Sequence, residues 1–396
     1  MRSTTNAEAD ISGLAQVALW PRPSTCSRDR DRRSRAARRH LVIFDAIRSL
    51  AALAVLLGHA DGTFPPFAPD KTHHIASALW PQQMGVVIFF LLSGYLITET
   101  LDRRLRDPKA TFADFAIDRF ARIYSAFLPA IIVVALIDIY SFRTCPYPSP
   151  ETIARFTPGI FIENLFMLQA PDVAWPFGSG NPFWSVAIEF WIYMFVGLSA
   201  FALRDGLTPA KGIAIIAVSF IPLQSIDSNN LVFVPWVMGA IVRQVIATGA
   251  LRKVATSALL ATLAAGVGMV IWRNILGETR VYDNLTSLTL AATFLAIVAL
   301  SKRLPEQNVA TIIAAWFARW SYSLYLLHHS VLQLFHSAFG DDPPILIPII
   351  ASITLSIAFA ELTEVHHRKL GAFLKRQLHE RVLPYVRSFS VRDRIL

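Results

Sequence analysis

The sequence contains few charged residues and almost no cysteine. Only 16% of its 396 residues are charged, whereas 54% are apolar and the mean hydropathy is +0.46, far above the usage of soluble proteins. Its two cysteines are Cys26 and Cys145, and in the topology predicted below they lie on opposite sides of a membrane, which excludes a bridge between them within one chain. The scarcity of charge indicates an integral membrane protein. The scarcity of thiols excludes a disulfide framework and a thiolate metal site.

The positive net charge does not indicate nucleic-acid binding. The chain has 37 Lys and Arg against 28 Asp and Glu, a balance that in a soluble protein would suggest a phosphate-binding surface. Here the basic residues stand at the ends of apolar stretches, which is the distribution that orients membrane proteins. We therefore expect the lipid bilayer, and no nucleic acid, as a partner.

Apolar segments recur along the chain at a length suited to cross a hydrocarbon layer of roughly 30 Å. They predict an all-α fold, a polytopic transmembrane helical bundle of about ten spans. The segments are 41–60, 83–101, 123–140, 183–203, 211–226, 229–247, 254–273, 284–301, 311–337 and 345–363. The stretch 155–171 is also apolar but contains Pro158, Glu163 and Asn164, so we expect it to lie at the outer interface or to re-enter.

The positions of the basic residues predict an orientation. With both termini in the cytoplasm, 30 of the 37 Lys and Arg residues fall on the cytoplasmic side and five on the outer side. Residues 1–40 are rich in arginine and poor in apolar side chains, which predicts a disordered cytoplasmic arm. Residues 41–365 would form the transmembrane domain, and 366–396 a basic cytoplasmic tail. The expected location is the inner (plasma) membrane.

The first apolar segment carries two ionisable residues on one face. Arg48 and His59 are eleven residues apart, which is about three helical turns and about 16 Å along the axis. An arginine within a span costs at least ~2.5 kcal/mol on insertion scales, so Arg48 should face a polar cavity or a partner, of which Asp45 is the nearest. In the alternative interpretation Asp45 and Arg48 only anchor the span, and His59 is an interfacial residue.

Two further arginines lie one turn apart at the predicted cytoplasmic edge. Arg119 and Arg122, taken alone, are explained as topology signals. The functional alternative is a phosphate clamp, because guanidinium groups bind phosphate oxygens in pairs.

The fourth segment contains a carboxylate within its apolar run. Glu189 lies about 10 Å below the predicted outer surface and shares a stripe with Ser185 and Tyr193. An ionisable residue at this depth is a functional-site hypothesis. His59 ends the first segment on the same side, so a contact between His59 and Glu189 is sterically possible. A neighbouring hydroxyl or backbone group could hold Glu189 instead.

The ninth segment, 311–337, is too long for one span. Its first turns are expected to lie along the cytoplasmic interface, with Trp316 and Trp320 as anchors and His328 near the middle of the bilayer. Packing and interfacial roles explain Tyr322 and Tyr325 when each is considered alone.

Five motifs on compatible segments occur in a fixed order. They are Arg48 with His59, Phe90-Leu91-Leu92-Ser93-Gly94-Tyr95, Arg119-x-x-Arg122-Ile123, Trp184-Ser185-x-x-x-Glu189-x-x-x-Tyr193, and Ser321-Tyr322-x-x-Tyr325-Leu326-x-His328. In motif order and predicted architecture the chain resembles the integral-membrane acyltransferase 3 family over roughly residues 41–365. Ser125 departs from the family pattern, which often has proline there, and puts only a local kink in doubt.

The resemblance implies acyl transfer, usually of acetyl from cytoplasmic acetyl-CoA to a carbohydrate hydroxyl at the outer face. The partners would be acyl-CoA and a carbohydrate or glycoconjugate acceptor, with no permanently bound cofactor and no metal. On this hypothesis Arg48, Arg119 and Arg122 bind the CoA phosphates, His59 is a general base or an acyl acceptor, and Glu189 orients it. Substrate or oxyanion contacts would come from Ser93, Trp184, Tyr325 and His328.

Two other classes of function remain open from the sequence. A transporter or flippase for a glycolipid or small solute would use buried Arg, Glu and His as pathway residues. A scaffold or receptor would use the same residues as structural pairs.

The predicted orientation can be tested by labelling cysteine probes from outside intact cells. We expect a membrane-impermeant maleimide to modify probes in 61–82 and 141–182, and to leave probes in 102–122 unmodified. Labelling of the 102–122 loop in intact cells would refute the orientation.

Overall fold

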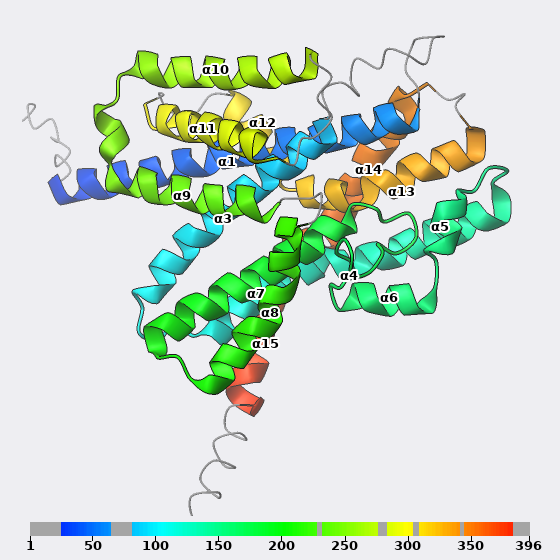
Figure 1. The fold of residues 1–396 in the computed structure, drawn as a ribbon, viewed down its shortest axis with the longest axis horizontal. Helices are drawn as coiled ribbons and strands as arrows, with labels where there is room; N and C mark the ends of the chain where they lie inside the picture. The colour runs from blue at the N-terminus through cyan, green and yellow to red at the C-terminus, as the bar shows by residue number, and fades with distance from the viewer. Residues whose placement is uncertain are drawn as a thin grey trace, which may run out of the picture.

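A computed structural model describes residues 25–64, 81–227, 232–275, 283–303, 309–340 and 344–382. Within these ranges the regular secondary structure is entirely helical, which confirms the predicted all-α fold (Figure 1). The longer helices are α1 (Thr25–Thr63), α3 (Pro81–Leu105), α4 (Phe112–Thr144), α7 (Phe183–Asp205), α8 (Pro209–Asp227), α9 (Phe233–Thr248), α10 (Thr256–Ile275), α11 (Asn284–Ser301), α13 (Ser321–Phe339) and α14 (Leu346–Leu362). The shorter ones are α5 (Pro150–Ala154), α6 (Pro158–Leu165), α12 (Val309–Ala318) and α15 (His367–Gln377).

Each of the ten predicted segments overlaps helical structure. In the described part of the chain, eight helices are long and apolar enough to cross a membrane, which supports a multi-pass membrane protein. The two remaining segments differ from simple spans. Helix α9 has 16 residues, or about 24 Å of length. The ninth segment is divided into α12 and α13 by a break at Arg319 and Trp320, so the expectation that it is not one continuous span is confirmed.

Three terminal and connecting regions are resolved further by the structure. Residues 25–40, predicted to be disordered, continue α1 instead, because no Gly or Pro interrupts this run and Arg and Ala favour helices. Residues 1–24 lie outside the described residues. The stretch 155–171 does not span, since its helix α6 has only eight residues. In the predicted tail, α15 packs against α4, and the Lys375 ammonium pairs with Asp118 at 2.7 Å.

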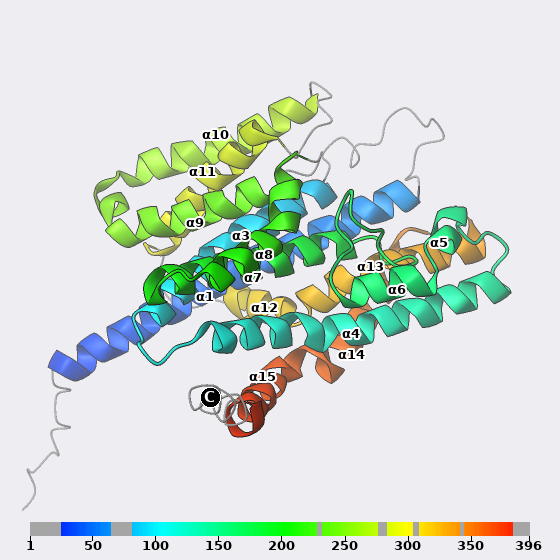
Figure 2. The ribbon, with the colours of Figure 1, turned by 60° about the horizontal axis from the view of Figure 1, so that its bottom comes forward.

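Helices α1 and α3 run side by side through the centre of the bundle (Figures 1 and 2). Helices α9, α11 and α10 follow on one side, with α10 at the edge. Helices α4, α7, α13 and α14 lie on the other side. Two of the sequence motifs therefore lie on this inner pair, and the other three lie on α4, α7 and α13 on one side of it.

Helices α3 and α9 approach each other closely at two glycines. A Cβ atom on Gly94 would lie 1.9 Å from the Trp236 carbonyl oxygen, and one on Gly239 would lie 2.0 Å from the Leu91 carbonyl oxygen. Such backbone contact requires small residues, as in many membrane helix pairs. It also brings the Trp236 indole within 3.2 Å of Ser93, to which its N–H donates.

We expect Gly94→Val and Gly239→Val to destabilise the bundle, because the added atoms collide with a neighbouring backbone and overpacking costs about 1–3 kcal/mol per site. Gly212→Val and Gly268→Val are matched controls, since a Cβ at either position meets no atom within 4 Å. The measurement is the thermal midpoint and the yield of monodisperse protein after detergent extraction. Equal midpoints for the two pairs would show that α3 and α9 do not pack this closely.

Candidate functional site

Two cavities lie next to each other within the bundle. The first, of about 160 Å³, is lined by Arg48, Arg119, Arg122, Glu189, Tyr193 and Tyr322, and we name it the arginine cavity. The second, of about 650 Å³, is lined by His59, Gln82, Gln83, Arg155, Asn181 and Trp184, and we name it the histidine cavity. Val86 and Tyr325 line both. The two cavities therefore meet at these two side chains.

Helix α1 supplies one key residue to each cavity. Arg48 lines the arginine cavity and His59, eleven residues further along, lines the histidine cavity. Asp45 is the acidic neighbour of Arg48, but the ion pair is long, at 3.9 Å. The Arg48 guanidinium is therefore not committed to a close contact with Asp45 and can meet an anion in the cavity.

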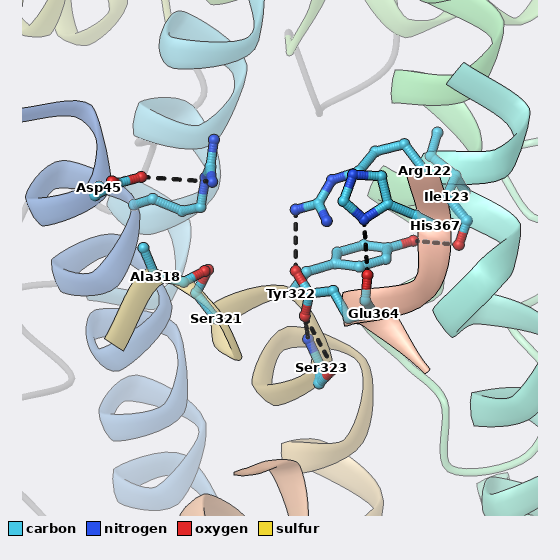
Figure 3. A network of polar contacts seen from close by, with 10 residues as sticks. Asp45, Arg122, Ile123, Ala318, Ser321, Tyr322, Ser323, Glu364 and His367 are labelled. Atoms are coloured by element: carbon cyan, nitrogen blue, oxygen red, sulfur yellow. Dashed lines mark hydrogen bonds and ion pairs between the residues drawn. The ribbon is translucent and has the colours of Figure 1, made fainter. Parts of the chain in front are cut away.

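Arg122 is held by a buried carboxylate that the sequence analysis did not single out. Glu364 follows α14 and is 2% exposed. Its Oε1 accepts from Arg122 at 2.9 Å, and its Oε2 accepts from the Ser323 hydroxyl at 3.0 Å and from the Ser323 N–H at 3.2 Å (Figure 3). The carboxylate therefore ties α4 to the start of α13.

Arg119 has no comparable acid. Its Nε is buried without a hydrogen-bond partner, and no ion pair of Arg119 occurs among the described residues. The guanidinium lies 5.8 Å from the centre of the Phe115 ring. A buried N–H without an acceptor is costly, so the arginine cavity suits an anionic ligand.

Glu189 lines the arginine cavity rather than the histidine cavity. Its Oε1 accepts from the Tyr193 hydroxyl at 2.5 Å. That hydroxyl lies 2.8 Å from Ser93, which accepts from the Trp236 indole. The Tyr193 hydroxyl donates its one proton to Glu189, so in its contact with Ser93 it must accept, and Ser93 donates. The chain of hydrogen bonds therefore runs from Trp236 through Ser93 and Tyr193 to the Glu189 carboxylate. A neighbouring hydroxyl thus holds Glu189, the alternative left open by the sequence.

His59 contacts His328, not Glu189, in the described part of the chain. The Nδ1 of His328 lies 2.8 Å from the Leu324 carbonyl oxygen, so this nitrogen carries a proton and donates it. In a neutral His328 the Nε2 is then an acceptor. It lies 3.0 Å from the Nδ1 of His59, which must donate to it. The Nε2 of a neutral His59 is therefore left without a proton, as a base or a nucleophile requires.

The adjacent His329 anchors a loop beside this pair. Its Nδ1 donates to the Ser179 carbonyl oxygen at 2.8 Å, and the Ser179 N–H donates to Asp138 at 2.9 Å. Asp138 is buried in α4 and was missed by the sequence analysis. The rule that selected Glu189, an acidic residue within an apolar segment, would also have selected Asp138. No similar signal marked Glu364, because it follows the end of the last predicted segment.

The remaining predicted residues are distributed between the cavities. Ser93 lines the arginine cavity and Trp184 lines the histidine cavity. Tyr325 stands between them, with its hydroxyl 2.6 Å from the hydroxyl of Ser185. The arginine cavity thus contains five of the predicted residues, Arg48, Arg119, Arg122, Glu189 and Ser93. The histidine cavity contains His59 and Trp184, and His328 contacts His59.

Comparison with known proteins gives one family match and partial relatives. A family model described as an acyltransferase domain matches residues 41–361. The O-acetyl transferase of Shigella phage Sf6 is 28% identical over 197 residues, which are 47% of this chain and 52% of the phage protein. The peptidoglycan O-acetyltransferase OatA of Listeria monocytogenes serovar 1/2a is 29% identical over 169 residues, 41% of this chain and 24% of that protein. The alignments thus span about half and about a quarter of these relatives. No solved structure matches the chain.

We expect Glu364→Ala to lower the stability of the protein by about 2–3 kcal/mol, because it leaves the Arg122 guanidinium and the Ser323 N–H without their acceptor. Glu361→Ala is the matched control on α14, since Glu361 and its partner Arg319 are 55% and 53% exposed. Thermal midpoints of the two purified variants give the comparison. Equal midpoints would contradict a structural role for the Glu364 contacts.

Proposed function

The chain belongs to the acyltransferase family, and on that premise we propose that it is a membrane-embedded O-acyltransferase. It transfers an acyl group, acetyl in the simplest case, from acyl-CoA to a carbohydrate hydroxyl. The observation that carries this proposal is the contact of His59 Nδ1 with His328 Nε2, which leaves the other nitrogen of His59 to act as a base, on the same helix as an arginine in the adjacent cavity. Acyl-CoA is a substrate, and no permanently bound cofactor is proposed.

The donor binds at the arginine cavity. Arg48, Arg119 and Arg122 are the groups proposed to bind the CoA phosphates, because guanidinium groups pair well with phosphate oxygens. Arg119 supports this role most strongly, since its buried Nε has no partner within the described residues. With the predicted orientation, this cavity receives the donor from the cytoplasm and the histidine cavity receives the acceptor from the outer face.

The acyl thioester must reach His59 past Val86 and Tyr325, which line both cavities. Arg48 and His59 are separated by about 16 Å along α1, a distance that suits an extended pantetheine arm. The Tyr325 and Ser185 hydroxyls are 2.6 Å apart, so one of their two protons is used in the bond between them. When Ser185 donates to Tyr325, the Tyr325 proton is the one that can stabilise the oxyanion formed at the thioester carbonyl.

The chemistry begins at His59 Nε2. As a general base, it takes the proton of the acceptor hydroxyl while the hydroxyl oxygen attacks the thioester carbonyl. The tetrahedral intermediate then releases the CoA thiolate, which takes up the proton from His59. As a nucleophile, Nε2 would instead attack the carbonyl and expel the CoA thiolate, and the acceptor oxygen would then take the acyl group from Nε2 while the hydroxyl proton neutralises the thiolate. In both routes His328 keeps the reactive nitrogen free of a proton by accepting from Nδ1.

Glu189 has a different position from the one first expected. It lies among the arginines, hydrogen-bonded to Tyr193. We propose that it compensates part of their charge and keeps the Tyr193 hydroxyl oriented. Its effect on His59 then acts through the donor site rather than through a direct contact.

Purified protein incubated with acetyl-labelled acetyl-CoA and a cell-envelope fraction tests the proposal. An acyltransferase consumes the thioester and labels the acceptor at a rate that depends on His59, so His59→Ala should lose both. A transporter would move substrate across a vesicle membrane without release of CoA, and a scaffold would do neither. Turnover by His59→Ala close to the wild-type rate would remove histidine catalysis from the account.

The tautomer argument predicts a graded series at His328. His328→Phe removes the acceptor for His59 Nδ1 and should lower kcat by about a hundredfold or more. His328→Gln supplies a carbonyl oxygen in its place and should retain more activity. The acetyl-CoA dissociation constant should not change, because the arginine cavity is untouched. His336→Phe, eight residues further along α13, is the control, and equal losses for all three variants would contradict the argument.

The proposed clamp predicts that charge alone is insufficient at Arg122. Arg122→Lys keeps the positive charge but loses the planar pair of donors, so acetyl-CoA binding should weaken by about tenfold or more. Arg319→Lys, at an exposed ion pair, is the matched control. An unchanged dissociation constant in Arg122→Lys and also in Arg48→Ala would show that the phosphates bind elsewhere.

A further inference from the structure

The wall of the histidine cavity carries three carboxamide side chains that the reaction above does not use. Gln82 and Gln83 are on the first turn of α3, and Asn181 lies in the loop before α7. None of the three side chains takes part in a hydrogen bond within the described residues, although each has two donor protons and an acceptor oxygen. The cavity therefore offers several unused polar groups from two of its sides.

The two glutamines show most clearly that a partner is missing. The Oε1 atoms of Gln82 and Gln83 are both buried without a hydrogen-bond partner. Buried polar atoms of this kind are rare in native structures, and each one needs an explanation. Because rotation about the last side-chain bond exchanges the oxygen and the nitrogen of a carboxamide, either end of each glutamine can turn to a molecule in the cavity.

A glycine, Gly58, brings Gln82 close to His59, the proposed catalytic residue. A Cβ atom on Gly58 would lie 2.2 Å from the Gln82 Oε1 and 2.7 Å from the Gln82 backbone nitrogen. Gly58 directly precedes His59. The first turn of α3 is thus pressed against α1 one residue from His59, and a molecule bound by Gln82 lies next to the imidazole.

The other lining residues favour an uncharged ring. Trp175 and Trp184 provide aromatic surface in the same cavity. The Arg155 guanidinium lies 4.5 Å from the centre of the Trp175 ring and forms an ion pair with Glu151, so its charge is compensated. Aromatic faces suit the apolar face of a sugar ring, whereas carboxamides suit its hydroxyl edge. Among the described residues that line the cavity, Arg155 is the one arginine, so these residues form no cluster of uncompensated arginines of the kind that an anionic sugar would need.

Building on the acyltransferase function proposed above, we propose that Gln82, Gln83 and Asn181 bind the acceptor as a neutral sugar ring. Their amide groups hydrogen-bond two of its hydroxyls and direct a third to the Nε2 of His59. The three residues are positioning and specificity residues for the acceptor, and they take no part in proton transfer. An acceptor carrying a carboxylate or a phosphate on the same ring binds more weakly.

The test measures CoA release from acetyl-CoA by purified protein as a function of added sugar. The probes are two neutral trisaccharides, of glucose and of N-acetylglucosamine, and the anionic trisaccharide of galacturonic acid. We expect a neutral trisaccharide to accept acetyl and the anionic one to fail. Gln82→Leu and Asn181→Leu should raise the half-saturating concentration of the neutral sugar by about tenfold or more each. The acetyl-CoA dissociation constant should stay at its wild-type value.

Gln244→Leu is the matched control, because Gln244 is an exposed carboxamide on α9, outside both cavities. If Gln82→Leu does not purify as a single species, Gln82→Glu keeps the size, removes the donor and should show the same loss.

A half-saturating sugar concentration in the Leu variants equal to that of the wild type, or preference for the anionic trisaccharide, would overturn the inference. If a cell-envelope fraction accepts acetyl but neither neutral sugar does, this inference fails and the proposed function stands. If nothing accepts acetyl, the proposed function fails as well.

Discussion

Arginines inside an apolar bundle require groups that compensate their charge. The ion pair between Glu364 and Arg122 is the interaction on which the rest of the site depends. The carboxylate connects the end of α14 to α4 and, through Ser323, to the first turn of α13. This contact fixes α13 along its axis. Five residues further along, His328 meets His59 of α1, so the charge compensation in one cavity determines the geometry in the other.

The division into two cavities suits the two demands of the acyl transfer that we propose. An anionic donor requires cationic groups, which the arginine cavity concentrates in a small volume. A hydroxyl acceptor requires a base and neutral polar groups, which the histidine cavity provides beside His59. Tyr325 lies at the boundary and lines both cavities. Only a few side chains therefore separate the proposed donor site from His59.

The sequence predicted those features that depend on one helix at a time. Apolar length located the helices, and the spacing of Arg48 and His59 placed both residues on one helix, where they line adjacent cavities. Contacts between helices were harder to predict from the sequence. A depth estimate placed Glu189 at the level of His59, but depth along α7 gives no information about the distance to α1. Glu364 was missed because its burial depends on the path of the chain after α14. The helical start of α1 was missed because the prediction gave more weight to the positive charge of residues 25–40 than to their helix propensity.

In the mechanism that we propose, one donor molecule extends from the arginine cavity to His59. An experimental structure of the protein with a non-hydrolysable thioether analogue of acetyl-CoA tests it directly. The account predicts phosphate oxygens within hydrogen-bond distance of Arg119 and Arg122, and the carbonyl carbon of the analogue next to the Nε2 of His59. An analogue bound with its phosphates away from these arginines, or with its acyl end on the far side of Tyr325 from His59, would contradict it.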